Sequence, residues 1–145
     1  MSLWNDHDRW SALCSSATCP ICLRREPMDV VAKLEGSWVT MQEAAPVPGY
    51  VCLVSQTHAV DLHDLPEAAA FLFMRDARKV SMALASVTRA VKMNYEIHGN
   101  STPHLHMHFF PRYRGDQFEG QPINPRLVVQ PVYTQESSKE PVTLL

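Results

Sequence analysis

The sequence predicts an α+β fold in which a single antiparallel sheet of about five strands packs with one long helix and a short N-terminal helix. Runs of β-branched and aromatic residues, separated by turn residues, predict the strands, and a long segment with helical periodicity interrupts them. The 145 residues are enough to bury one core. We therefore expect residues 1–145 to form one domain, with its core at about 19–113 and a C-terminal tail at 114–145.

The first half of the chain is predicted to contain the short helix and three strands. Trp4, Trp10 and Leu13 have a loosely helical spacing, which predicts a short helix near the N-terminus. Three strand-like runs follow, divided by Gly36 and by the turn-rich "AAPVPG", and they read "DVVAKLEG", "SWVTMQE" and "GYVCLVSQT".

The long helix is predicted to begin at Asp64. The Asp64 carboxylate can accept the free N–H groups of a first turn, Glu67 lies three residues later as a capping partner, and Pro66 is tolerated this early. Apolar residues then recur at spacings of four and three, as on one helix face: Phe73, Ala77, Val80, Leu84, Val87 and Val91.

Two further strands are expected after the helix. They read "AVKMNYEI" and "HLHMHFFP", the loop "HGNSTP" joins them, and we expect Pro111 to end the second. The tail contains one apolar run, "RLVVQPV", which is compatible with an edge strand or with an arm onto a partner.

Composition excludes several classes of function. A net charge of −2 provides no broad basic field, so no nucleic-acid partner is expected. No apolar run approaches the ~20 residues that cross a membrane, and no signal-peptide pattern is present, so we expect a cytoplasmic protein with no membrane partner. In that compartment the four cysteines are expected to stay reduced rather than form disulfides.

The run "HLHMHFF" places three histidines at every second position. In a strand, His104, His106 and His108 would share one face, and the other face would carry the apolar residues Leu105, Met107 and Phe109. The outer two positions would lie roughly 13 Å apart, whereas zinc needs nitrogens within about 2.0–2.1 Å, so at most two neighbours can share an ion. A row of imidazoles suits proton transfer and nucleophilic attack, with His106 at its centre.

The loop before this strand has the composition of an anion site. Gly99 permits a close backbone approach, and Asn100 and Ser101 supply neutral hydrogen-bond donors. The backbone N–H groups that follow can form a concave site, for which phosphate is the natural ligand.

The segment "NYEIHGNSTPHLHMHFFPRY" resembles the histidine triad superfamily, whose signature is His-x-His-x-His followed by two apolar residues. Upstream, "TMQEAAPVPGYVCLVSQTHAVDLHDL" is similar to the family's nucleoside-binding half. The resemblance spans about Cys19 to Tyr113. It implies a histidine triad (HIT) fold, a homodimer, a nucleotide substrate, and chemistry that needs neither a catalytic metal nor an organic cofactor.

The resemblance also implies roles for individual residues. The catalytic set would be His104, His106 and His108, where His106 attacks the α-phosphorus and is transiently nucleotidylated and His108 contacts the phosphate and the leaving group. Gln42 falls where the family binds the ribose hydroxyls, and Asn94 resembles a family residue near the phosphate. The implied substrate-binding set is Gln42, Asn94, Gly99, Asn100 and Ser101.

One position departs from the family pattern and another has two interpretations. Tyr50 follows the Pro-Gly turn where many members have a histidine, so a histidine relay beyond the triad is not implied. Arg112 either reaches a distal phosphate or is an exposed structural arginine. His7, His63 and His98 have no partner pattern and are interpreted as surface or locally satisfied imidazoles.

The pair "CPIC" has the spacing of a zinc knuckle or of a redox dithiol, and two unbound thiols are a third interpretation. A structural zinc site needs four ligands. In zinc-containing members of the superfamily, a Cys-x-x-Cys pair joins a histidine of the upstream segment and the first histidine of the triad. The resemblance therefore implies structural Zn²⁺ with the ligands Cys19, Cys22, His58 and His104.

The function that follows is a nucleotide hydrolase or nucleotidyl transferase cleaving at the α-phosphorus of a dinucleoside polyphosphate or similar nucleotide. Pro111 and Arg112 after the triad favour the diadenosine polyphosphate hydrolase-like branch. The alternatives are a nucleoside phosphoramidate hydrolase, and a nucleotide-binding regulatory zinc module with weak turnover.

Overall fold

The computed structural model describes residues 1–128, so most of the apolar run "RLVVQPV" and the end of the predicted tail lie outside the described residues. The helical elements are η1 (Leu3–Asn5), α1 (His7–Cys14), α2 (Pro20–Arg24), η2 (Leu62–Asp64) and α3 (Glu67–Thr88). The strands are β1 (Val30–Lys33), β2 (Ser37–Thr40), β3 (Val51–Ser55), β4 (Lys92–Glu96) and β5 (His106–Arg112). Across the described residues, no helix combines the length and apolar character needed to span a bilayer.

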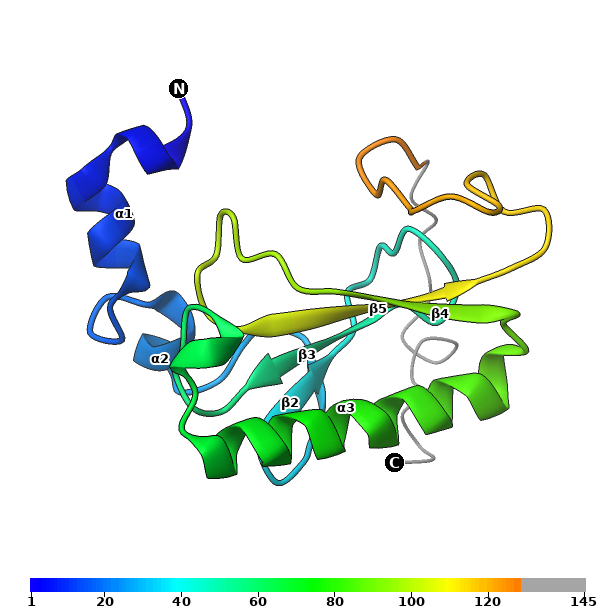
Figure 1. The fold of residues 1–145 in the computed structure, drawn as a ribbon, viewed down its shortest axis with the longest axis horizontal. Helices are drawn as coiled ribbons and strands as arrows, with labels where there is room; N and C mark the ends of the chain where they lie inside the picture. The colour runs from blue at the N-terminus through cyan, green and yellow to red at the C-terminus, as the bar shows by residue number, and fades with distance from the viewer. Residues whose placement is uncertain (129–145) are drawn as a thin grey trace.

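The five strands form one sheet in the order β1-β2-β3-β5-β4, and each neighbouring pair is antiparallel. Helix α3 runs across one face of this sheet, and the segment 113–128 lies on the side of the other face (Figure 1). The predicted α+β fold with five antiparallel strands, one long helix and a short N-terminal helix is confirmed. The assignment of the whole chain to one domain stays a prediction.

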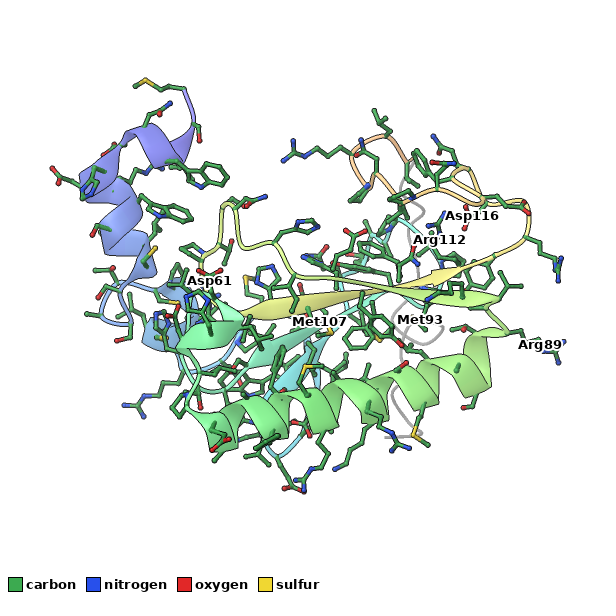
Figure 2. The ribbon with its side chains drawn as sticks, viewed as in Figure 1. Asp61, Arg89, Met93, Met107, Arg112 and Asp116 are labelled. Atoms are coloured by element: carbon green, nitrogen blue, oxygen red, sulfur yellow. The ribbon has the colours of Figure 1, made fainter. Side chains whose placement is uncertain are left out.

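The main core lies between the sheet and α3. Met93 and Met107 are directed from the sheet toward this helix (Figure 2) and join the same buried cluster as Phe73. The helix contributes further residues at the predicted spacings of four and three: Ala77, Val80 and Leu84. Their burial explains why apolar residues recur at these spacings in the sequence of α3, because the buried face of a helix repeats every three to four residues.

Strand β5 alternates as predicted, with one exception. Met107 and Phe109 are buried in the core beneath the sheet, whereas His106 and His108 line a pocket on the other face. The expectation that His104 belongs to the same strand face is wrong, because β5 begins at His106. His104 lies in the segment just before the strand, and its side chain contacts Cys19 and the Ser55 carbonyl instead of the pocket. Pro111 does not end the strand, which runs to Arg112.

The boundaries of α3 differ from the prediction at both ends. Asp64 belongs to η2, where its carboxylate accepts the Asp61 N–H at 3.0 Å, and the helix begins at Glu67 after Pro66. At the other end, Arg89 adopts a left-handed conformation with φ of 54° and stops the helix. Val91 therefore lies beyond the helix and is exposed.

A buried arginine ties the C-terminal segment to the sheet. The Arg112 guanidinium donates to both carboxylate oxygens of Asp116 at 2.8 Å, to the Asn94 side-chain oxygen at 2.7 Å, and to the carbonyls of Phe118 and Gln121. Figure 2 shows Arg112 and Asp116 together at the end of β5. Arg112 is structural, as one of its two interpretations held, but it is 6% exposed rather than exposed.

The ion pair predicts a pH dependence of stability. Hydrogen bonds from Arg112 lower the pKa of the Asp116 carboxyl from 3.8 to about 2. A folded-state pKa below the unfolded value stabilises the protein above about pH 4, and this contribution of roughly 1–2 kcal/mol disappears as the pH falls toward 2. Urea unfolding at pH 7, 4 and 2.5 measures this effect. The free energy of unfolding should fall more between pH 7 and pH 2.5 in the wild type than in Asp116→Asn. The exposed Asp8 provides the control variant Asp8→Asn, which should behave as the wild type. Equal acid loss in Asp116→Asn and the wild type would contradict the assignment.

Candidate active site and metal centre

A pocket of about 770 Å³ lies on the sheet face opposite α3. His106 and His108 form part of its wall, the loop 99–102 forms another part, and the segment 122–126 closes a further side. The pocket brings together six of the residues that the sequence singled out: Gln42, Gly99, Asn100, Ser101, His106 and His108.

The His106 ring is fixed by the backbone that precedes it. Its Nδ1 lies 2.7 Å from the carbonyl oxygen of His104, which can only accept a hydrogen bond. Nδ1 must therefore carry the proton, and Nε2 keeps its lone pair. A half-buried imidazole in this tautomer has the lone pair that nucleophilic attack requires.

The neighbouring His108 is held in the complementary tautomer. The Tyr50 hydroxyl lies 2.7 Å from His108 Nδ1. Because burial raises the pKa of Tyr50, the hydroxyl stays protonated and donates a hydrogen bond to this nitrogen. Burial, with a smaller effect from His106 and His98, lowers the pKa of His108 to about 4. His108 is thus neutral near pH 7 and presents Nε2–H as a donor beside His106, with the two ring centroids 4.9 Å apart.

Tyr50→Phe tests this contact. The variant leaves His108 Nδ1 without its hydrogen-bond donor, which costs about 1 kcal/mol of stability. The proton of His108 is then no longer restricted to Nε2. We expect kcat on a nucleotide substrate to fall about tenfold, with little change in KM, because a free ring points its donor correctly only part of the time. Tyr95→Phe is the matched control, since Tyr95 is 49% exposed and bonds Ser81 on the other face of the sheet. A Tyr50→Phe variant with unaltered kcat would show that the hydroxyl has no orienting role.

The loop before β5 has the geometry of an anion site. Gly99 has φ of +76°, a conformation that L side chains rarely adopt, and it turns the chain over the pocket. Among residues 1–128, the N–H groups of Asn100, Ser101 and Thr102 donate to no protein acceptor. The Trp4 indole donates to the Asn100 carbonyl at 3.2 Å and tethers the loop to the N-terminal segment.

Two of the predicted site residues lie outside this pocket. Asn94, on β4, does not line it, and its side-chain oxygen accepts a hydrogen bond from Arg112 at the end of β5. His104 is directed to a separate cluster with two cysteines. Two further residues line the pocket: Glu96, which the sequence did not single out, and His98, which was interpreted only as a surface or locally satisfied imidazole. They pair with each other at 2.9 Å. Their i, i+2 spacing at the end of a predicted strand was the available signal.

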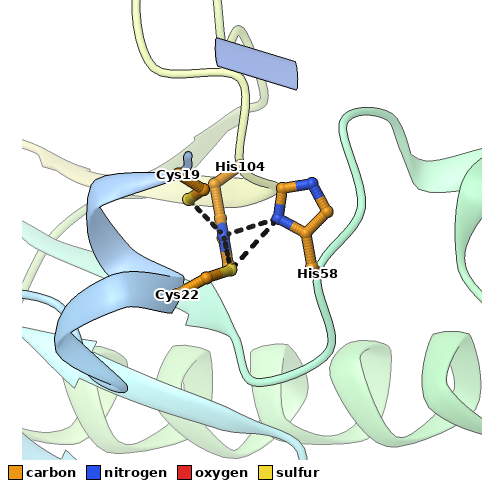
Figure 3. Close-up of side chains that lie close together, drawn as sticks. All are labelled: Cys19, Cys22, His58 and His104. Atoms are coloured by element: carbon orange, nitrogen blue, oxygen red, sulfur yellow. Dashed lines mark hydrogen bonds between the residues drawn. The ribbon is translucent and has the colours of Figure 1, made fainter. Parts of the chain in front are cut away.

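Four side chains predicted as metal ligands do come together: Cys19, Cys22, His58 and His104 (Figure 3). Cys19 lies at the start of α2 and Cys22 within it, His58 comes from the loop after β3, and His104 precedes β5. Cys19 Sγ and Cys22 Sγ lie 3.3 and 3.7 Å from His104 Nδ1, and Cys22 Sγ lies 3.3 Å from His58 Nδ1.

The imidazoles of this cluster are arranged as metal ligands. His58 Nε2 donates to the Cys14 carbonyl at 2.9 Å, and His104 Nε2 donates to the Ser55 carbonyl at 2.8 Å. Both Nδ1 atoms are then unprotonated, yet they face each other at 3.3 Å. A tetrahedral ion at about 2.0–2.1 Å from nitrogen and about 2.3 Å from sulfur separates its ligand atoms by roughly 3.3–3.8 Å, so the donor set fits such an ion.

A second group of potential ligands involves the other two histidines of the triad. Cys52, His106 and His108 bring their donor atoms within 4.8 Å of one another. This group has three donors, one fewer than the four ligands of a structural zinc site, and burial raises the pKa of the Cys52 thiol to about 12. His104 belongs to a different group from His106 and His108, as the distance argument from the sequence required.

Solved structures similar to this chain are histidine triad proteins. One from Bradyrhizobium japonicum is 28% identical over 79% of this chain and 85% of that chain, with a TM-score of 0.69. One from Sinorhizobium meliloti is 19% identical over 80% of this chain and 88% of that chain, with a TM-score of 0.71. A Zn-bound histidine triad family protein from Mycobacterium smegmatis is 19% identical over 90% of this chain and 92% of that chain, with a TM-score of 0.62.

Sequence comparison gives the family directly. A comparison with curated protein sequences gives no match. The model of the HIT domain matches residues 24–115, which is more than half of the chain and includes β1 to β5. The chain therefore belongs to the HIT domain family, whose members are nucleotide-binding hydrolases or transferases.

Proposed function

We propose that the protein cleaves nucleotides at the α-phosphorus through a covalent nucleotidyl-His106 intermediate, as a hydrolase or nucleotidyl transferase. The observation that carries this proposal is the hydrogen bond of 2.7 Å from His106 Nδ1 to the His104 carbonyl, which leaves the Nε2 lone pair for a ligand in the pocket. A dinucleoside polyphosphate of the kind cleaved by diadenosine polyphosphate hydrolases is the first substrate to test.

The reaction has two displacements at phosphorus. In the first, the bond from His106 Nε2 to phosphorus forms while the bond from phosphorus to the leaving group breaks. In the second, water attacks the phosphorus and releases His106. His108 Nε2–H and the unpaired N–H groups of the loop 99–102 are the donors available to the charged phosphate oxygens. Gln42 is the residue proposed to bind the ribose hydroxyls.

We infer that the four-ligand cluster binds structural Zn²⁺ through Cys19, Cys22, His58 and His104. The donor distances support this, and the similarly folded Mycobacterium smegmatis protein is zinc-bound. Bound zinc would supply folding free energy by joining α2 to the entry of β5. The same residue that ligates through its side chain holds His106 through its carbonyl, so the metal centre would also orient the nucleophile.

A homodimer in the cytoplasm is the proposed assembly and location. Exposed apolar side chains on α3 and β4 support a partner on that surface, among them Phe71, Met82 and Tyr95. Size-exclusion chromatography with light scattering should give twice the mass of the chain, and a monomeric mass at all concentrations would contradict the dimer.

Hydrolysis in H₂¹⁸O tests the site of cleavage. Diadenosine tetraphosphate and adenosine 5′-phosphoramidate are incubated with the protein, with and without a chelator, and the products are analysed by mass spectrometry. Attack at the α-phosphorus predicts that ¹⁸O enters AMP in both cases. Label in the released polyphosphate fragment instead would contradict the proposal. Tight AMP binding without turnover of either substrate would favour the regulatory module.

A further inference from the structure

When the leaving group is basic, the proposed reaction needs a proton at that group, and the triad does not supply it. His106 is used as the nucleophile. His108 accepts a hydrogen bond from the Tyr50 hydroxyl at Nδ1, and its pKa of about 4 keeps the ring neutral at pH 7. A neutral imidazole donates a hydrogen bond through Nε2–H but does not release that proton near neutral pH. A basic leaving group would therefore depart without protonation unless another acid faces the pocket.

A second imidazole faces the same pocket and is paired with a carboxylate. His98 Nε2 lies 2.9 Å from Glu96 Oε2, and both residues line the pocket beside His108. The His98 ring centroid is 6.1 Å from that of His108. The His98 side chain is 53% exposed and the Glu96 side chain 21%, so the imidazole can exchange protons with water while its carboxylate partner is half-buried.

The pairing fixes which nitrogen of His98 is available for proton transfer. The Glu96 carboxylate is 2.9 Å from His98 Nε2 and accepts its N–H, which leaves Nδ1 as the ring nitrogen that can exchange a proton with a bound ligand. The other titratable or charged groups that line the pocket are the imidazoles of His106 and His108, the Tyr50 hydroxyl, and the Arg126 guanidinium on the C-terminal segment. Glu96 is the only carboxylate among the described residues that line this pocket, and it is directed to His98.

We propose that His98 is the general acid of this site, oriented by Glu96, and that it extends the substrate class to nucleotides with basic leaving groups. The inference rests on the proposed function of His106. As the bond from His106 Nε2 to phosphorus forms and the bond to the leaving group breaks, His98 transfers its proton to the departing nitrogen or oxygen. In the second displacement, neutral His98 takes the proton of the attacking water, which restores the starting state.

The proposal predicts a dependence on the leaving group. An amine or an unactivated phenolate needs protonation as it departs, whereas a 4-nitrophenolate or a polyphosphate is stable as an anion. Loss of His98 should therefore be costly only for the first group. A residue that merely supports the pocket would affect all leaving groups alike, because its loss would change binding or geometry rather than proton transfer.

The experiment compares three substrates in single turnover: adenosine 5′-phosphoramidate, the phenyl ester of AMP and the 4-nitrophenyl ester of AMP. For His98→Asn, we expect the rate of nucleotidyl transfer to His106 to fall about 10²- to 10³-fold with the first two and only a few-fold with the nitrophenyl ester. Glu96→Gln, which keeps an acceptor but removes the charge, should show the same pattern with a smaller loss. His63→Asn is the control, because its side chain is 82% exposed and does not line the pocket.

The outcomes separate this proposal from the one it rests on. An equal loss of rate for all three substrates in His98→Asn, or no loss for any of them, overturns the role of His98 while nucleotidylated His106 in the wild type still supports the proposed function. Absence of a nucleotidyl-protein adduct with every substrate in the wild type overturns both proposals. The nitrophenyl ester also reports folding, since a misfolded variant would lose activity on it as well.

Discussion

Replacing His106 by Asn is expected to lower kcat by at least about a thousand-fold on any nucleotide substrate, with little change in KM. The variant removes the Nε2 lone pair that forms the bond to phosphorus. An asparagine amide can still donate to the His104 carbonyl, which His106 Nδ1 contacts at 2.7 Å, so the entry to β5 should keep its conformation. Steady-state kinetics on diadenosine tetraphosphate and adenosine 5′-phosphoramidate measure the loss.

The control for this variant is again the exposed His63. His63→Asn changes the same residue type outside the pocket and should keep wild-type kcat. Thermal unfolding of both variants checks that the fold is retained. A His106→Asn variant that folds normally and keeps kcat within tenfold of the wild type would be incompatible with nucleophilic catalysis by this residue.

The second large effect concerns the metal centre. Cys22→Ser is expected to lose bound zinc and to lower the free energy of unfolding by at least about 3 kcal/mol, because a ligand present at a thousand times its dissociation constant stabilises by about 4 kcal/mol. Without a cation, burial and the neighbouring Cys19 raise the pKa of the Cys22 thiol to about 11, so this thiol is protonated at pH 7 in the absence of zinc. Elemental analysis and urea unfolding, with and without chelator, measure both effects.

Cys14→Ser is the matched control for zinc. Cys14 contributes its backbone carbonyl to His58 but is not one of the four clustered ligands, so its side chain should be replaceable without metal loss. Equal zinc content in Cys22→Ser and Cys14→Ser would remove the support for the ligand set. In the proposed zinc site His104 would join the ion to His106, so chelation should also lower kcat, and added zinc should restore kcat.

Alternation and spacing of residues in the sequence predicted the features that depend on neighbouring residues alone. The alternation of Met107 and Phe109 with His106 and His108 gave the two faces of β5, because a strand repeats every two residues. The predicted start of α3 at Asp64 is wrong because a competing local interaction uses the capping side chain. Asp64 has the chemistry of a cap, but it uses its carboxylate within η2, on the Asp61 N–H, and leaves α3 to begin at Glu67.

The contacts that the sequence did not reveal join residues far apart in the chain. Tyr50 and His108 are 58 positions apart, and no pattern in either segment shows that the hydroxyl reaches Nδ1. Arg112 and Asp116 form a helix-like i, i+4 pair, yet they lie at the end of a strand, where the segment 113–128 turns back over the sheet. Asn94 resembles a family residue near the phosphate, but its side-chain oxygen accepts a hydrogen bond from Arg112 and it does not line the pocket.

Peptide mapping of the trapped intermediate is the most direct test of the central claim. The protein is mixed with adenosine 5′-phosphoramidate or diadenosine tetraphosphate, quenched within milliseconds at alkaline pH to preserve a phosphorus–nitrogen bond, digested and analysed by tandem mass spectrometry. We expect an AMP adduct on His106 that is formed and lost at rates consistent with kcat. Turnover without any adduct, or an adduct on a residue other than His106, would contradict it.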